Sequence, residues 1–176
     1  MPEARIVWRG WALNKRTAAM VEAAEKLYKS KFAILQGSYN KGGVEASAGT
    51  HDGGGAIDID VHTKSVAQRV AVVKAMRAVG FAAWLRTPAQ GNWPYHVHAI
   101  AVGDKDLSRG AATQVAEYHR KRNGLANRGR DDGPPRRSPG PGPRPTPRSS
   151  RRASARTPSR PARWSSPAPA AWARAP

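Results

Sequence analysis

Two short segments of the chain contain residue types that bind metal ions. The first segment, SAGTHDGGGAIDIDV, begins at Ser47 and contains His51, three consecutive glycines and Asp58. The second segment, NWPYHVHAIAV, contains His96 and His98, two residues apart. Because the chain has no cysteine, histidine and carboxylate side chains are the ligands that it can offer to a metal ion. A metal site is therefore the first chemistry that the sequence suggests.

The alternation of residues in both segments predicts that these side chains share one face of a sheet. Residues two apart in a strand point the same way, so His96 and His98 project together, and Asp58 projects away from the isoleucines beside it. His51 precedes the first strand, and the glycines at 53–55 allow backbone angles that other residues resist. We therefore expect the loop to fold His51 back over the strand toward Asp58.

Zinc suits this set of ligands. Catalytic zinc sites have three protein ligands, drawn from histidine, carboxylate and thiolate groups, and leave a fourth position to water or substrate. His51, Asp58 and one of His96 and His98 would make such a set. Zinc acidifies a water and polarises a substrate carbonyl, so the sequence predicts a zinc cofactor and hydrolytic chemistry.

Periodicity predicts the elements that would position these side chains. The order α-β-β-α-β-β-α, with short connections, favours an α+β fold with a small, mainly antiparallel sheet. Helices would cover one face of this sheet, and the zinc cleft would lie on the other. The predicted helices span residues 17–30, 65–79 and 108–122, and the predicted strands span 32–36, 56–61, 81–86 and 95–102.

Composition divides the chain at about residue 125. Residues 133–176 contain ten arginines, no acidic residue and twelve of the 15 prolines, so they supply more than half of the net charge of +18. A segment of this composition buries too little apolar surface to offset the entropy cost of ordering it. We expect a catalytic domain over residues 1–125 and a disordered Pro/Arg/Ser/Ala-rich tail over 126–176.

The two motifs together resemble a known family. THDGGGAIDID followed by YHVH is similar to the zinc D-alanyl-D-alanine carboxypeptidase/dipeptidase family, which shares its fold with lysostaphin-type endopeptidases and the hedgehog signalling domain. The resemblance covers residues 34–100. It implies that His51, Asp58 and His98 bind zinc, and that His96 orients the reacting water and stabilises the oxyanion.

The resemblance also suggests a substrate-binding surface, with one departure from the family pattern. LQGSYN is similar to the family's substrate loop, and an aromatic side chain beside the second motif could wall the cleft. Many members carry a glutamate as general base at the position of Tyr95, so here His96 is the first choice of base and Asp60 the second. The residues expected to contact a peptide are Gln36, Ser38, Tyr39 and Trp93.

These observations predict a peptidase that acts at the bacterial cell wall. The expected substrate is a peptidoglycan stem peptide, and the enzyme would be a carboxypeptidase or an endolysin-like endopeptidase working as a monomer. No apolar run approaches the roughly 20 residues of a membrane span, and MPEARIVWRGWALNKR lacks the apolar stretch of a signal peptide, so the export route stays open. One alternative is a non-catalytic zinc-containing module that binds wall peptides. A nucleic-acid binder driven by the basic charge ranks last, because no recognition motif is visible, and we expect no specific nucleic-acid partner.

Overall fold

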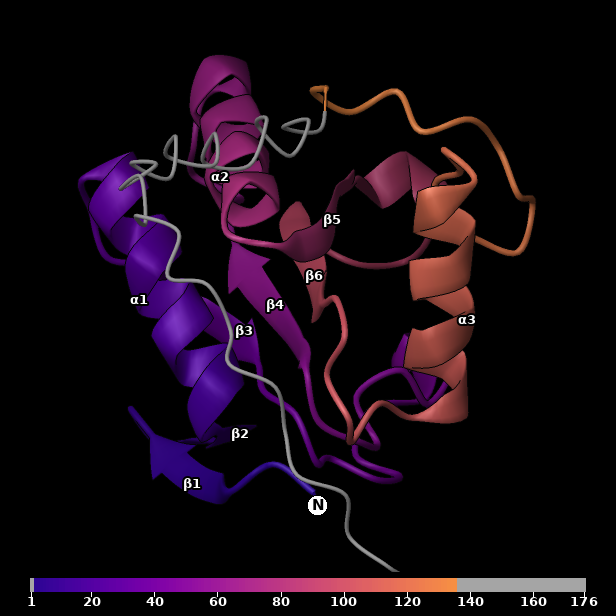
Figure 1. Ribbon diagram of the computed structural model, residues 1–176. Coiled ribbons are helices and arrows are strands. Elements are labelled where there is room, and N and C mark those ends of the chain that lie inside the picture. The colour runs from indigo at the N-terminus through magenta and orange to yellow at the C-terminus, as the bar shows by residue number, and fades with distance from the viewer. Residues whose placement is uncertain (1, 136–176) are drawn as a thin grey trace, which may run out of the picture. The chain divides into compact units, whose positions relative to one another are not determined.

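The computed structural model describes residues 2–135 of the 176-residue chain and has an α+β fold. The predicted tail from residue 136 onward lies outside the described residues. The four predicted strands and three predicted helices are all present (Figure 1). The elements are β1 (Arg5–Trp8), β2 (Trp11–Asn14), α1 (Lys15–Tyr28), β3 (Ile34–Gln36), β4 (Ala56–Asp60), α2 (Val66–Ala78), β5 (Phe81–Arg86), β6 (His96–Ala101) and α3 (Arg109–His119).

The main sheet has four antiparallel strands in the order β3-β4-β6-β5. The two motif strands, β4 and β6, are therefore neighbours in the middle of the sheet. Their register pairs Asp58 with His98 and Asp60 with His96. Because paired residues in an antiparallel sheet place their side chains on the same face, this register brings the acidic and imidazole groups together.

The opposite face of the sheet forms the main hydrophobic core. Ile57, Ile59, Val97 and Ala99 are completely buried there, together with apolar residues of α1 and α2. Figure 1 shows α1 and α2 on this side of the sheet. The alternation of residues in the sequence thus places the apolar side chains of β4 and β6 on the core-facing side of the sheet and their acidic and imidazole side chains on the other side.

The third helix departs from the prediction that all helices cover one face. Figure 1 shows α3 on the other side of the sheet from α1 and α2. Ala111 and Tyr118 of α3 pack with Ala56, Ala82 and Ile100 in a second apolar cluster. These sheet residues lie on the same face as the histidines but nearer the other end of their strands. That end of the face is apolar, and α3 shields it from solvent.

A hairpin at the N-terminus is the element that the sequence analysis left unassigned. β1 and β2 pair antiparallel through a tight turn at Arg9 and Gly10, whose φ angles are +49° and +83°. Two consecutive residues with positive φ are typical of the type I′ turn that joins short hairpins. Asn14 ends the hairpin and caps α1, because its side chain accepts a hydrogen bond from the backbone of Thr17 at 2.7 Å.

The chain continues past α3 as an ordered segment that follows the outer edge of β5. The indole of Trp84 donates to the carbonyl of Arg122 at 3.0 Å, and the buried Arg77 pairs with Asp131 at 2.8 Å. Residues 126–135, which composition assigned to the tail, therefore include a segment that contacts the domain. Among residues 2–135, no helix is long and apolar enough to cross a membrane.

Candidate metal centre

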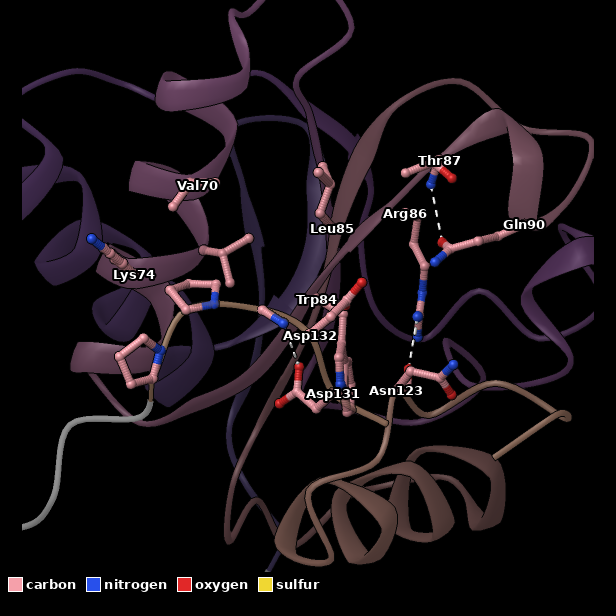
Figure 2. Close-up of a pocket in the computed structure, with 14 residues that line it drawn as sticks. Val70, Lys74, Trp84, Leu85, Arg86, Thr87, Gln90, Asn123, Asp131 and Asp132 are labelled. Atoms are coloured by element: carbon pink, nitrogen blue, oxygen red, sulfur yellow. Dashed lines mark hydrogen bonds between the residues drawn. The ribbon is translucent and has the colours of Figure 1, made fainter. Parts of the chain in front are cut away.

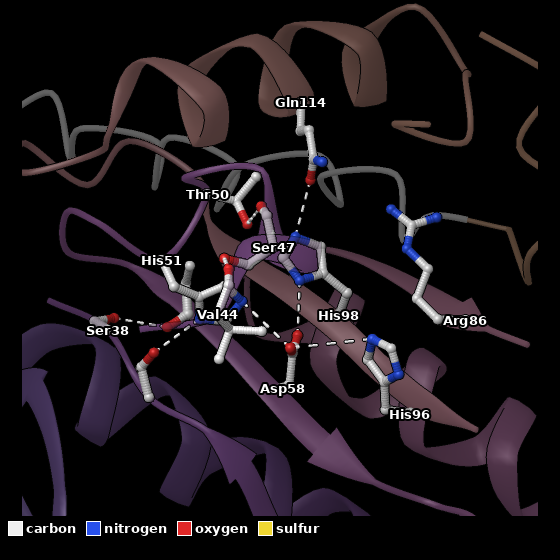
Figure 3. Close-up of polar contacts among 12 residues, drawn as sticks. Ser38, Val44, Ser47, Thr50, His51, Asp58, Arg86, His96, His98 and Gln114 are labelled. Carbon is white, nitrogen blue, oxygen red and sulfur yellow. Dashed lines mark hydrogen bonds and ion pairs between the residues drawn. The ribbon is translucent and has the colours of Figure 1, made fainter. Parts of the chain in front are cut away.

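Asp58 lies at the centre of the site, and the imidazoles of two histidines contact its carboxylate from different sides. His98, its partner in the strand register, places Nδ1 2.7 Å from Asp58 Oδ1. His51 places Nε2 3.3 Å from Asp58 Oδ2 (Figure 3). All three side chains are buried, with residue exposures of 0% for His51, 7% for Asp58 and 5% for His98.

The glycine run positions His51, as the sequence predicts, although the glycines act in two ways. Gly55 has a φ of +80°, in the left-handed region that favours glycine. Gly53 has no such angle, but a Cβ there would lie 2.2 Å from the carbonyl oxygen of Asp106, so no side chain fits. The loop is further held by the backbone hydrogen bond from Gly54 to Asp106, at 2.7 Å.

Hydrogen bonds on the far side of each ring aim an imidazole lone pair at Asp58. Nδ1 of His51 lies 2.7 Å from the carbonyl oxygen of Gly37, to which it donates its hydrogen. Nε2 of His98 lies 2.8 Å from Oε1 of Gln114 on α3 and donates there. In these tautomers Nε2 of His51 and Nδ1 of His98 carry lone pairs on the side of the carboxylate, an arrangement that favours a shared cation.

The three residues could therefore bind a metal ion. One ligand atom from each of His51, Asp58 and His98 lies within 4.8 Å of the other two. Nε2 of His51 is buried and has no hydrogen-bond partner among the described residues. A buried polar atom without a partner is costly, and a cation between the imidazoles and the carboxylate would remove that cost.

The electrostatics of the site favour positive charge next to Asp58. Burial alone would raise the pKa of Asp58, but the neighbouring imidazoles of His98 and His51 hold it well below its ordinary value. Burial also opposes charge on His51, yet Asp58 raises the pKa of His51 above its ordinary value. At His98 burial dominates and lowers the pKa, so a neutral ring with a free lone pair is favoured there.

His96, the predicted catalytic residue, lies beside this trio. Its Nδ1 is 2.8 Å from the carbonyl oxygen of Pro94, to which it donates, and its Nε2 is 4.0 Å from Asp58 Oδ2. Asp60, the second choice of base, instead pairs with His62 at 2.7 Å. Tyr95 stacks against the guanidinium of Arg69 at 3.6 Å and packs on the main core, so no carboxylate enters the site from its position.

The four predicted substrate-binding residues fall into two pairs. Gln36 is paired with Asp58 in the register of β3 and β4, and the ring of Trp93 meets the ring of His96 edge-on at 6.0 Å, so both border the site.

Ser38 and Tyr39 make contacts elsewhere. The Ser38 hydroxyl donates to the carbonyl of Ala56 at 2.6 Å. The Tyr39 hydroxyl donates to Asp106 at 2.8 Å, and the guanidinium of Arg5 stacks on the Tyr39 ring. The structure therefore does not bring the Tyr39 hydroxyl to the trio.

Two residues near the site were not identified from the sequence. Gln114 fixes the ring of His98 from α3, and no sequence signal distinguishes it from any other helix glutamine. Arg86 is buried at the end of β5, paired in register with His96. The strand alternation FAAWLR places Arg86 on the same face as Trp84, whose ring stacks on His98 at 6.2 Å, so its position could have been inferred.

Comparisons of the chain with protein-family models, with curated proteins and with solved structures find no match. The chemistry of the site is therefore argued from its residues.

Proposed function

We propose that this chain is a zinc-dependent peptidase that hydrolyses amide bonds in bacterial cell-wall peptides. The observation that carries the proposal is the convergence of His51, Asp58 and His98, with both imidazole lone pairs on the side of the carboxylate. Two nitrogen ligands and one oxygen ligand form a set found in hydrolytic zinc sites. The motif resemblance in the same residues supports peptidoglycan peptides as the substrate class, with the cell wall as the place of action.

Each residue of the site then has a defined task. His51, Asp58 and His98 would hold the zinc ion, and Gly37 and Gln114 would fix the two imidazoles. The ion supplies Lewis acidity that polarises a carbonyl and acidifies water. His96 donates to Pro94 through Nδ1, so its Nε2 is free to accept a proton from the attacking water and to orient it.

Alanine substitutions of the three ligands test the proposal directly. We expect His51→Ala, Asp58→Ala and His98→Ala each to lose bound zinc and to stop releasing new amino termini from purified peptidoglycan. His119→Ala is the matched control, because His119 is an exposed histidine at the end of α3. Full hydrolysis by zinc-free His98→Ala protein would refute the peptidase.

One observation favours the alternative of a non-catalytic zinc module that binds wall peptides. Tyr95 occupies the position at which the resembled family carries a carboxylate base, and its side chain packs away from the site. Measurements of zinc content and of peptidoglycan hydrolysis distinguish the two functions. A binding module would retain zinc and sediment with peptidoglycan while releasing no termini, whereas the peptidase should lose turnover and keep zinc in His96→Ala.

A further inference from the structure

Arg86 is a buried cation with an unused hydrogen-bond donor. The residue is 3% exposed, and its Nη1 donates to the backbone carbonyl of Asn123 at 2.8 Å. Its Nη2 is buried and has no hydrogen-bond partner among residues 2–135. A buried guanidinium with an unpaired donor is costly unless a ligand completes it.

A second buried arginine shows what complete pairing looks like in this domain. Arg77 donates to the carbonyl of Ala83 at 2.9 Å and to both oxygens of Asp131 at 2.8 and 2.9 Å. No carboxylate of the described residues forms an ion pair with Arg86. Burial lowers the pKa of Arg86 to about 10, so the guanidinium stays protonated at neutral pH. The buried charge of Arg86 therefore interacts with the carboxylates of Asp58 and Asp131, but neither of them forms a direct ion pair with it.

Arg86 lies next to the metal centre in the sheet. In register it is the partner of His96, and it lies on the same sheet face as His98. Figure 3 draws Arg86 on the opposite side of His98 from His51. The residue also lines a cavity of about 510 Å³ at the edge of β5, together with Thr87, Gln90 and Asn123 (Figure 2). Arg86 thus lies on the same sheet face as the metal centre and also borders a cavity at the edge of β5, whose lining includes Asp131 and Asp132.

Two further N–H donors near the metal centre also lack hydrogen-bond partners among the described residues. Nε2 of Gln36 and Nε1 of Trp93 are also buried and unpaired within the described part of the chain. Gln36 lies beyond Asp58 from His98 in the register, and Trp93 lies against His96. A ligand that reaches Arg86 must supply hydrogen-bond acceptors, and a carboxylate matches the guanidinium with two oxygens.

We propose that Arg86 binds a free carboxylate of the peptide substrate next to the bond that is cut. This inference rests on the peptidase proposed above and makes it more specific. A peptide whose terminal carboxylate sits on Arg86 presents its last amide bond to the metal centre. The enzyme is then a carboxypeptidase or dipeptidase that trims chain ends, and it discriminates against internal bonds.

A pair of peptides that differ only at the terminus tests this assignment. One peptide ends in D-Ala-D-Ala with a free carboxylate, and the other is its C-terminal amide. We expect zinc-loaded wild type to cleave the acid with a kcat/KM about 10–100-fold higher, the range expected for hydrogen bonds to a charged group. Arg86→Met should lose this preference by slowing on the acid alone, and Arg86→Lys should keep part of it. Lys26→Met is the control, because Lys26 is an exposed cation on α1, on the other side of the sheet.

Binding measurements keep the test independent of turnover. Calorimetry with N-acetyl-D-alanyl-D-alanine and its amide should show the same acid preference in zinc-loaded wild type and its loss in Arg86→Met at equal zinc content. Equal affinity for acid and amide, or a preference that survives Arg86→Met, overturns the role of Arg86. If the acid preference in binding is present but neither peptide is hydrolysed, the peptidase fails while the carboxylate site stands. If Arg86→Met does not fold, the Arg86→Lys and wild-type comparisons decide the outcome.

Discussion

Two of the buried carboxylates in the domain, Glu25 and Asp58, have surroundings that differ in kind. Glu25 of α1 is 3% exposed and is surrounded by donors that are always present. It pairs with Arg9 of the hairpin turn at 2.6 Å and with Lys31 at 2.9 Å, and it accepts the backbone N–H of Phe32 at 2.9 Å. Although burial opposes ionisation, these donors lower the pKa of Glu25 to about 2. Glu25 therefore joins the hairpin, α1 and the start of the following strand.

The pKa of Asp58 also lies well below its ordinary value, although no arginine or lysine of the described residues contacts its carboxylate. Its neighbours are the imidazoles of His51, His98 and His96, at 3.3, 2.7 and 4.0 Å. An imidazole can point either a hydrogen or a lone pair at a carboxylate, so this cluster is complete only when it holds protons or a metal ion. The contrast indicates that Glu25, held by arginine and lysine, is structural, whereas Asp58, held by histidines whose outer nitrogens are already bonded, could bind a cation.

The largest expected effect comes from exchanging each carboxylate for its amide. Asp58→Asn should reduce bound zinc from one ion per chain to none, because an amide oxygen is a weaker ligand and carries no charge. Glu25→Gln should retain the ion in full. Zinc content by mass spectrometry of protein purified in excess zinc, with circular dichroism to confirm folding, checks both. Loss of zinc in both variants would erase the distinction drawn between the two acids.

A second prediction concerns stability in the presence of the ion. A ligand that binds the folded state alone stabilises it by about 2.7 kcal/mol at a free concentration 100-fold above its Kd. We expect zinc to raise the free energy of unfolding by this amount in wild type and in Glu25→Gln. Asp58→Asn should show no gain at the same zinc concentration. Urea unfolding with and without a chelator measures the difference, and a zinc-independent wild type would contradict the metal site.

The convergence of His51, Asp58 and His98 could be predicted from the sequence because strand alternation and glycine placement are local properties. Asp58, His96 and His98 follow from a period of two, and the loop glycines direct His51. Two features do not follow from residue spacing: the Tyr39 hydroxyl bonds to Asp106 instead of facing the trio, and α3 covers the polar face of the sheet (Figure 1). Both depend on which surfaces the rest of the fold leaves uncovered.

The same limit applies to the arginines and to the hairpin. Arg77 and Arg86 are both buried beside β5, yet only coordinates show that one is paired with Asp131 and the other is not. The hairpin does not follow from periodicity, because strands of four residues give little alternation to detect, although RIVW-RG-WALN contains a turn signal at Arg9 and Gly10.

A smaller effect is expected from the residue that orients His98. Removing the outer hydrogen bond of a metal-binding imidazole typically weakens metal affinity by about 10–100-fold. Gln114→Leu removes the acceptor for Nε2 of His98 while keeping roughly the size of the side chain. The Kd for zinc should therefore rise about 10–100-fold, while excess zinc still fills the site. Competition with a chromogenic chelator measures the affinity. Thr113→Val is the control, since the Thr113 hydroxyl bonds within α3.

The smallest effect is the pH dependence of Glu25, and its sign follows from the direction of its pKa. A carboxylate with a folded pKa of about 2 contributes stability that is fully present above its unfolded pKa, which is about 4.3. That contribution is lost as the pH falls through about 2. Arg9 and Lys31 are partly exposed, so each ion pair is worth about 1 kcal/mol or less, and Glu25→Gln should cost wild type about 1 kcal/mol at pH 7.

The two proteins should converge in acid, and the comparison is best made on zinc-free protein so that Asp58 contributes equally to both. Urea midpoints measured between pH 7 and pH 2.5 should differ by a constant amount down to about pH 5. Below that pH the gap should narrow, because Glu25 of the unfolded wild-type chain takes up a proton while Glu25 of the folded chain stays ionised. Urea is preferred to guanidinium because a neutral denaturant leaves the ion pairs unscreened. A gap that stays constant to pH 2.5 would mean that packing of the side chain, rather than its charge, holds the hairpin to α1.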